Sequence, residues 1–317
     1  MKVLVTGGAG FIGRNLVLRL IESKRHEVVV LDNLSVRQTS NCLPPEAEFH
    51  FGDFTNRSTM ARALQGANVV IHLAALSGVI DSVVDPRPSF EINVAGSFQL
   101  LELAREAGVR RFIFASTGGA LLGDVTPPIS EGMSPAPLSP YGATKLALEG
   151  YCSAFASAYD LACIALRFSN IYGPQSSHKK SVVASFIKNA LRQESLVVYG
   201  DGTQRRDYLY VGDLVKGIET AIDGNLVGTF QLGSGKPTSL RELISILNGI
   251  IGGRLAVRFE PARRGEVHST WCDISKATRE FGFAAPTSLH EGLRLTWQWF
   301  AESSNSWMRD IATFSAD

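Results

Sequence analysis

The sequence is poor in cysteine, in net charge and in long apolar runs, and each shortage excludes a class of protein. The four cysteines are scattered, with no Cys-x-x-Cys pair and no histidine at metal-ligand spacing, so we expect reduced thiols and no metal site. A formal net charge of +1 provides no global field that would select nucleic acid or an anionic membrane. No stretch approaches the roughly 20 apolar residues of a membrane span. Because no signal peptide precedes the first expected strand, we predict a soluble, cytoplasmic protein.

Short apolar runs alternate with longer amphipathic stretches in the first half of the chain. Runs such as VVVL and NVVIHLAA are apolar without alternation, which is typical of strands buried on both faces of a parallel sheet. The alternation predicts an α/β fold with a doubly wound parallel sheet of Rossmann type. We expect strands at 2–6, 27–31, 48–51, 69–73, 111–115 and 162–168, and helices at 12–23, 58–64, 88–107 and 141–159.

The rhythm breaks near residue 170, where proline and glycine begin to punctuate the chain. Helices are expected at 182–192, 213–221 and 240–250, and a strand at 228–232 that returns to the sheet. We therefore predict a Rossmann domain at 1–168, completed by parts of 207–232. A smaller C-terminal lobe, mainly 169–317, would close a ligand cleft against it.

A glycine turn follows the first expected strand, in VLVTGGAGFIG. Gly7 permits a tight turn, Gly10 lets backbone N–H groups approach a diphosphate, and Gly13 allows close packing of helix on strand. A diphosphate would lie there at the positive end of the helix dipole. Asp32 ends the second strand about 20 residues on, where it would bind both ribose hydroxyls and repel a 2′-phosphate. The pattern predicts NAD rather than NADP, against the alternative of an unligated turn.

A tyrosine and a lysine stand four residues apart in YGATK. On a helix Tyr141 and Lys145 share one face, about 6 Å apart. A phenol is a poor base at its reference pKa of about 10, but a neighbouring ammonium and a cationic nicotinamide both favour the phenolate. The pair follows the strand at 111–115, whose polar end includes Thr117, and ligands of open α/β sheets gather at such ends. We predict that Tyr141 is a general base and that Thr117 binds the reacting oxygen.

The glycine turn and the Tyr–Lys pair belong to a longer series of motifs. So many motifs in one order identify a family far more specifically than any single motif does. The sequence resembles the extended short-chain dehydrogenase/reductases of the NAD-dependent epimerase/dehydratase family, and among these it is most similar to the UDP-hexose 4-epimerases. The resemblance covers nearly the whole chain, through TGGAGFIG (6–13), LDNLS (31–35), GDF (52–54), HLAA (72–75), STGGALLG (116–123), YGATK (141–145), LRFSNIYGP (166–174), VYGDGTQRRDYLYV (198–211), LGSGKPTS (232–239) and PARRGE (261–266).

The resemblance implies a role for each matching residue. Thr117, Tyr141 and Lys145 would form the catalytic triad. The cofactor would contact Gly7, Gly10, Phe11, Ile12, Gly13, Asp32, Asn33, Asp53, Phe54, Leu73, Ala74, Ala75, Asn93 and Phe168, together with Tyr141 and Lys145. The nucleotide sugar would contact Thr117, Gly118, Gly119, Asn170, Val182, Val183, Tyr199, Arg206 and Arg263. The resemblance further implies a homodimer through the helices at 88–107 and 141–159.

The residues after Thr117 discriminate between reactions of the family. The resembling 4,6-dehydratases carry an Asp-Glu pair there, and the decarboxylases carry a nearby glutamate, whereas this chain has Gly118 and Gly119. Neither glycine can donate or accept a proton through a side chain. What remains is reversible oxidation at C4 of a UDP-hexose, through a transient 4-keto sugar. The two glycines would leave room for the sugar to turn over between the two hydride transfers.

The loop SSHKKSVV at 176–183 leaves the sugar open. Lys179 or Lys180 would attract a C6 carboxylate, which retains UDP-glucuronate as an alternative substrate, and the other reading is that both are exposed lysines without a role. A 4-keto reductase of the same fold is a second alternative, which Asp32 disfavours because it selects against NADPH. A non-catalytic NAD-binding regulator is a third, which the retained Tyr141 and Lys145 disfavour.

Overall fold

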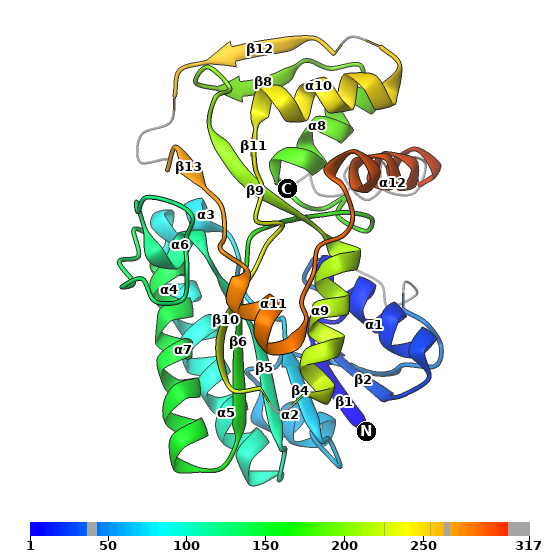
Figure 1. Cartoon of the computed structure of the whole chain (residues 1–317). Helices are drawn as coiled ribbons and strands as arrows, with labels where there is room; N and C mark the ends of the chain where they lie inside the picture. The colour runs from blue at the N-terminus through cyan, green and yellow to red at the C-terminus, as the bar shows by residue number, and fades with distance from the viewer. Residues whose placement is uncertain (37–42, 225, 254, 263–266, 304–317) are drawn as a thin grey trace.

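A computed structural model of the chain describes residues 1–36, 43–224, 226–253, 255–262 and 267–303 (Figure 1). One of the four cysteines, Cys42, and the predicted substrate residue Arg263 lie outside these ranges. Within them, Cys152, Cys163 and Cys272 are buried free thiols. No helix in the described ranges is long and apolar enough to cross a membrane, and no cluster of three or more potential metal ligands occurs there.

A seven-stranded parallel sheet forms the centre of the larger part of the molecule, called the Rossmann layer below. This sheet confirms the predicted fold class. The strand order is β10-β6-β5-β4-β1-β2-β3. From β1 the chain adds strands toward one edge, and from β4 it adds them toward the other, so the order of the strands reverses between β1 and β4. The crevice above such a reversal is where dinucleotides bind in doubly wound folds. The strands are β1 (Lys2–Thr6), β2 (Glu27–Asp32), β3 (Glu48–Phe51), β4 (Val69–His72), β5 (Arg111–Thr117), β6 (Ala162–Phe168) and β10 (Gly228–Leu232).

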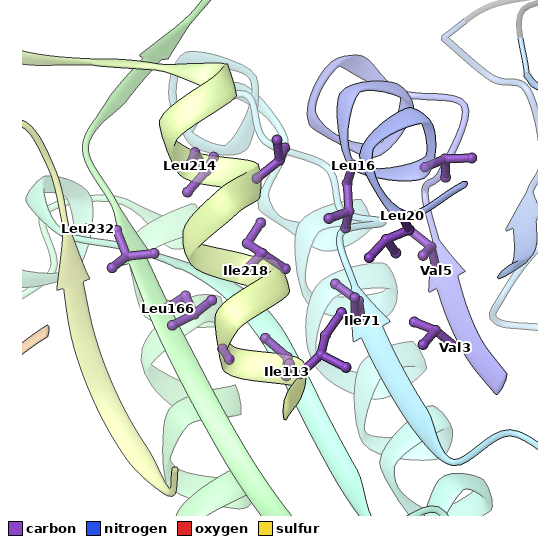
Figure 2. Packing of buried hydrophobic residues seen from close by; sticks show 14 of the residues in the cluster. Val3, Val5, Leu16, Leu20, Ile71, Ile113, Leu166, Leu214, Ile218 and Leu232 are labelled. Atoms are coloured by element: carbon purple, nitrogen blue, oxygen red, sulfur yellow. The ribbon is translucent and has the colours of Figure 1, made fainter. Parts of the chain in front are cut away.

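Helices cover both faces of this sheet, as Figure 1 shows. One face packs against α1 (Phe11–Ser23), α9 (Val211–Asp223) and α11 (Ser275–Phe281), and the other against α2 (Arg57–Ala63), α5 (Ser97–Glu106) and α7 (Pro140–Ala158). In Figure 2, Ile218 of α9 and Leu16 of α1 lie over the sheet with Ile113 and Leu166. All four are fully buried. The Rossmann layer therefore takes elements from beyond residue 168, as far along the chain as α11.

The smaller lobe has its own sheet pairs and its own core. Strands β7 (Asn170–Tyr172), β9 (Arg205–Tyr210), β11 (Pro237–Ser239) and β13 (Ser269–Thr270) form one sheet, and β8 (Leu196–Tyr199) pairs with β12 (Val257–Glu260). Helices α8 (Val182–Leu191), α10 (Leu240–Ile251) and α12 (Leu289–Glu302) pack on them around Leu243, Leu293 and Phe300. Ser239 and Glu242 begin α10 with reciprocal side-chain-to-backbone hydrogen bonds, a capping box.

The single helix predicted at 88–107 is wrong in detail. The segment is divided into α4 (Pro86–Phe90), a π-helical turn η1 (Glu91–Gly96) and α5, and it is preceded by a short helix α3 (Val79–Val84). The π turn carries Asn93, whose side chain binds the backbone of Leu76 in the loop after β4. Such widened turns are rare and occur mainly where a side chain has to be placed for function. The periodicity of the sequence does not reveal this break.

Candidate active site

The glycine turn between β1 and α1 approaches neighbouring backbone too closely for any side chain. A Cβ at Gly13 would lie 2.2 Å from the Gly7 carbonyl oxygen, and a Cβ at Gly7, where φ is +70°, would lie 2.6 Å from Ala74 N. Gly10 caps α1 without a side-chain hydrogen bond. The first turn of α1, which includes Phe11 and Ile12, therefore presents its backbone N–H groups toward the crevice. This cradle has the shape and polarity that a dinucleotide diphosphate requires.

Asp32 lies beside this turn at the carboxyl end of β2. Its two carboxylate oxygens accept hydrogen bonds from Ala9 N at 3.0 Å and from Leu34 N at 2.8 Å. Burial raises the pKa of Asp32, although these two bonds oppose the rise. An ionised carboxylate has about four lone-pair sites, so two remain for ribose hydroxyls. The geometry agrees with the expected ribose contact.

A second group of predicted cofactor residues surrounds the adenine side of the crevice. Asn33 donates to Asp53 at 2.9 Å, and Asp53 also accepts from Thr55 N at 2.8 Å. The bonds to Asp53 lower its pKa against the opposing effect of burial. Phe54 is buried and packs edge-on against His72 at the end of β4. The carboxyl ends of β2, β3 and β4 are thus held together at one edge of the sheet.

Asn93 holds the loop that contains Leu73, Ala74 and Ala75. Its Oδ1 accepts from Leu76 N at 2.9 Å, while its Nδ2 donates to Leu76 O at 2.9 Å and to Thr144 Oγ1 at 3.3 Å. Both amide hydrogens of Asn93 are therefore engaged by protein atoms. Asn93 therefore links the loop after β4 to α7. Any effect of Asn93 on the cofactor acts through the position of that loop.

The predicted catalytic residues lie on two elements in contact, β5 and α7. Thr117 is the last residue of β5, and Tyr141 and Lys145 occupy the first turns of α7. Lys145 Nζ lies 5.8 Å from the centroid of the Tyr141 ring. Tyr141 N donates to Ser82 Oγ at 3.1 Å, so α3 fixes the start of α7. The tyrosine is half-buried and the lysine is buried.

Burial opposes the two influences that are expected to favour the Tyr141 phenolate. Burial raises the pKa of Tyr141 to about 12 and lowers the pKa of Lys145 to about 8. Desolvation disfavours the charged form of both groups and outweighs their mutual effect. The protein alone therefore favours a neutral phenol, and a base at this position needs further positive charge, such as that of oxidised nicotinamide.

The expected space at the glycine pair is present at only one of the two positions. A Cβ on Gly118 would lie 2.8 Å from Gln231 Oε1 and 3.0 Å from Ile129 Cδ1, so protein side chains already fill that direction. A Cβ on Gly119 would lie 3.7 Å from Thr270 Oγ1, an ordinary van der Waals contact. Packing explains glycine at 118, and only 119 can lend room to a sugar. Thr270 comes from β13, so sequence spacing gave no sign of it.

The predicted sugar-nucleotide residues lie on the smaller lobe and at its junction with the sheet. Asn170 begins β7 and donates to Asp207 O at 3.3 Å. Arg206 of β9 donates to His268 O at 2.9 Å, and it pairs in register with Thr270. Val182 and Val183 lie in the first turn of α8, and Tyr199 lies at the end of β8. Phe168, a predicted cofactor contact, ends β6. Arg263 belongs to none of the described ranges.

The sequence profile of the NAD dependent epimerase/dehydratase family matches residues 3–233. The chain belongs to this family. A putative UDP-glucose 4-epimerase of Methanocaldococcus jannaschii is 36% identical over 310 residues, which cover 96% of this chain and all of that protein. Family membership makes NAD the cofactor of this enzyme, and the glycine cradle and Asp32 fit it.

Solved epimerase structures of this family superpose on nearly the whole chain. A UDP-glucose 4-epimerase of Thermotoga maritima, crystallised with UDP-glucose, has a TM-score of 0.92 at 37% identity and covers 96% of this chain and 100% of its own. A UDP-glucuronic acid 4-epimerase of Bacillus cereus, with UDP-glucuronic acid and NAD, has a TM-score of 0.88 at 32% identity and covers 95% of this chain and 99% of its own. The chain is similar to epimerases of both kinds along its full length.

Lys145 should reduce the stability of the cofactor-free enzyme at neutral pH. Its pKa is about 8 in the folded protein and 10.5 in the reference state, so burial of the ammonium costs up to about 3 kcal/mol below pH 8. This cost declines as the pH rises from 8 toward 10.5, because the folded protein then binds fewer protons than the unfolded chain. We expect Lys145→Met to be more stable than the wild type at neutral pH, with a smaller difference near pH 10.5.

Urea unfolding of the two NAD-free proteins across this pH range measures the effect. The control is Lys216→Met, which removes an exposed lysine of α9 and should leave the stability nearly unchanged at every pH. A variant at 145 that is less stable than the wild type at neutral pH contradicts the desolvation argument.

Proposed function

We propose that the enzyme inverts C4 of a UDP-hexose through a 4-keto intermediate, with Thr117, Tyr141 and Lys145 as the reacting triad. The observation that carries the proposal is the placement of Lys145 Nζ 5.8 Å from the Tyr141 ring at the start of α7, while Thr117 ends β5 beside two residues without acid or base side chains, Gly118 and Gly119. Dehydration and decarboxylation in this fold need an acidic group at that place. The similarity to UDP-glucose 4-epimerases along the full chain supports the same reaction.

In this proposal each protein group has a distinct task. Bound NAD supplies the acceptor and donor of hydride. The Tyr141 oxygen removes the proton from the sugar 4-hydroxyl, and it returns the proton after the sugar has presented its other face. Thr117 Oγ1 would bind the same substrate oxygen, and Lys145, whose Nζ lies 5.8 Å from the Tyr141 ring, would contact the cofactor and stabilise the phenolate. Because burial raises the pKa of Tyr141 to about 12, the phenolate depends on the cationic charge brought by oxidised cofactor.

Tyr141→Phe should retain bound NAD but lose epimerisation of UDP-glucose by several orders of magnitude, because the variant lacks the phenol oxygen that removes the proton from the sugar. NMR of the sugar C4 proton follows the reaction, and the absorbance of the purified protein reports the cofactor. The matched control is Tyr151→Phe, ten residues further along α7. Near-normal turnover by the first variant would remove Tyr141 from the role of base. A wild type that inverts no UDP-sugar of a glucose, N-acetylglucosamine and glucuronate panel would contradict the reaction itself.

UDP-glucuronate is the second candidate substrate, and Lys179 favours it. Lys179 Nζ lies 3.4 Å from Ser77 Oγ, in the loop that runs from the cofactor crevice to α3. Its own loop is fixed by Lys188 Nζ, which donates to Lys179 O at 2.8 Å. Desolvation lowers the pKa of Lys179, and no acidic group among the described residues opposes this shift. A carboxylate at C6 of the sugar would provide the missing counter-charge.

If Lys179 binds this carboxylate, Lys179→Met should lower kcat/KM for UDP-glucuronate by about 10-fold or more relative to UDP-glucose, which is the usual loss for a hydrogen bond between charged groups. Lys180→Met is the control, because Lys180 is the exposed neighbour. Steady-state rates with both sugars measure the ratio. An equal change for the two sugars would leave Lys179 without a role in specificity.

We further propose that the enzyme is a homodimer through α5 and α7. Phe98 and Tyr151 stack at 4.8 Å in a hollow between these helices, and Tyr159 at the end of α7 is half exposed. Val84 and Phe90 extend the apolar surface along α3 and α4. A continuous aromatic and apolar face of this kind is typical of a self-complementary interface. The cytoplasmic location expected from the sequence stays a prediction.

Tyr151→Glu should convert the dimer into monomers, because it buries a carboxylate at the proposed interface. Sedimentation velocity of the variant and the wild type measures the mass in solution. Phe259→Glu is the control, since Phe259 is also exposed but lies on β12 of the smaller lobe. The interface is refuted if the wild type sediments as a monomer. It is also refuted if Phe259→Glu dissociates the dimer and Tyr151→Glu does not.

A further inference from the structure

Three polar side chains from three elements meet in the interior beside α7. Arg167 of β6 donates to both oxygens of Glu149, through Nε to Oε1 at 2.9 Å and through Nη2 to Oε2 at 2.7 Å. Ser116 of β5 donates its hydroxyl to the same Oε1 at 2.6 Å. Only 5% of the Arg167 side chain and 8% of the Glu149 side chain are exposed. The two charges are therefore fixed by each other and shielded from water.

Each partner of Glu149 is adjacent to a group of the active site. Ser116 directly precedes Thr117, and Arg167 directly precedes Phe168, whose carbonyl accepts a hydrogen bond from Gly118 N at 3.2 Å. Ser116 and Arg167 also face each other in register across β5 and β6. The cluster therefore rests on the last residues of the two strands that end at the proposed sugar site.

On α7, Glu149 comes one helical turn after Lys145 and two turns after Tyr141. The axial distances are about 6 and 12 Å. A helix can shift along its axis or rotate while its apolar face stays packed, because apolar contacts are not directional. A two-pronged bond from arginine to carboxylate fixes both the axial position and the rotation. Glu149 therefore determines where Tyr141 and Lys145 stand relative to Thr117.

Stability gives no sufficient reason for this arrangement. Burial of an ion pair costs desolvation energy, and well-packed apolar residues in its place are often neutral or stabilising. Arg167 also has one buried nitrogen, Nη1, for which no hydrogen-bond partner occurs among the described residues. A buried ion pair with an unfilled hydrogen bond contributes little to the attachment of α7 to the sheet. Its directional bonds nevertheless fix the position of α7 on the sheet.

We propose that Glu149 and Arg167 are positioning residues, which hold α7 so that the Tyr141–Lys145 pair faces Thr117 and the bound cofactor. Neither side chain touches the reacting atoms, so both act through α7 and the strand ends. The inference rests on the proposed function, since it assigns to the pair the geometry of that same triad.

The test replaces both charges together. The double variant Glu149→Met/Arg167→Met leaves no unpaired buried charge, so we expect its melting temperature to stay close to that of the wild type, whereas Glu149→Gln alone should melt earlier. For the double variant we expect a kcat for UDP-glucose about 100-fold lower, as for a small misplacement of a reacting group, with KM and bound NAD nearly unchanged. Glu219→Gln is the control, because Glu219 is a similarly buried carboxylate that binds Arg19 of α1 and Arg25, two residues after α1 ends.

Recovery of both the melting temperature and kcat in the double variant would overturn the proposal, because the pair would then serve stability alone. A loss of kcat in Glu219→Gln equal to that in Glu149→Gln would overturn it as well. An absorbance titration of Tyr141 in the NAD-bound protein, isolated by subtraction of the Tyr141→Phe spectrum, needs no turnover. We expect the phenol to titrate at a different pH in the double variant, because displacement of α7 changes the burial that sets the pKa of Tyr141. A wild type that inverts no UDP-sugar contradicts the proposed function. In that case a changed titration of Tyr141 in the double variant still supports the positioning role, and an unchanged titration refutes it.

Discussion

The close approach of β1 and β4 is the constraint on which the site depends. These strands are neighbours at the reversal of the sheet, and the turn after β1 passes so near the loop after β4 that Gly7 has no room for a side chain. The same closeness leaves the first turn of α1 open toward the crevice. Asp32 joins the turn through Ala9, and Asn93 joins the β4 loop to α7. The parts that would bind cofactor and substrate are therefore fixed relative to one backbone contact.

Burial then sets the chemistry of the groups that surround this contact. It raises the pKa of Asp32 and Tyr141 and lowers that of Lys145, so all three are shifted toward their neutral forms. A buried charge without an opposing charge is costly, and the cost is relieved when a ligand supplies the missing partner. In the proposed reaction, binding of the oxidised cofactor and activation of Tyr141 are therefore electrostatically coupled. This coupling links the affinity for NAD to the reactivity of Tyr141.

Local patterns in the sequence predicted what local physics determines. The strands at 2–6, 48–51, 162–168 and 228–232 have the bounds that were expected. Of these, β1 and β6 are the largely buried, mainly apolar runs that a parallel sheet favours, whereas β3 is an edge strand with no buried residue. The glycine turn and the Tyr–Lys spacing are local as well. The break of the helix at 88–107 depends on Asn93 reaching Leu76, and the crowding at Gly118 depends on Gln231, so neither is visible in a short window. The Glu149–Arg167 pair spans 18 residues and two elements, and only the fold brings it together.

The smaller lobe was less predictable from the sequence than the Rossmann layer. Its dependence on contacts between distant segments also suits it to determine sugar specificity. Its strands are short, and the pairing of β9 with β13 joins residues more than sixty positions apart. The Rossmann layer has little freedom to vary, since its glycines are fixed by backbone contacts. Structures that hold UDP-glucose and UDP-glucuronic acid resemble this chain almost equally, so the fold itself cannot distinguish the two sugars. The distinction has to come from a few side chains on lobe segments, such as Lys179 and Thr270, which face a reaction centre that stays constant.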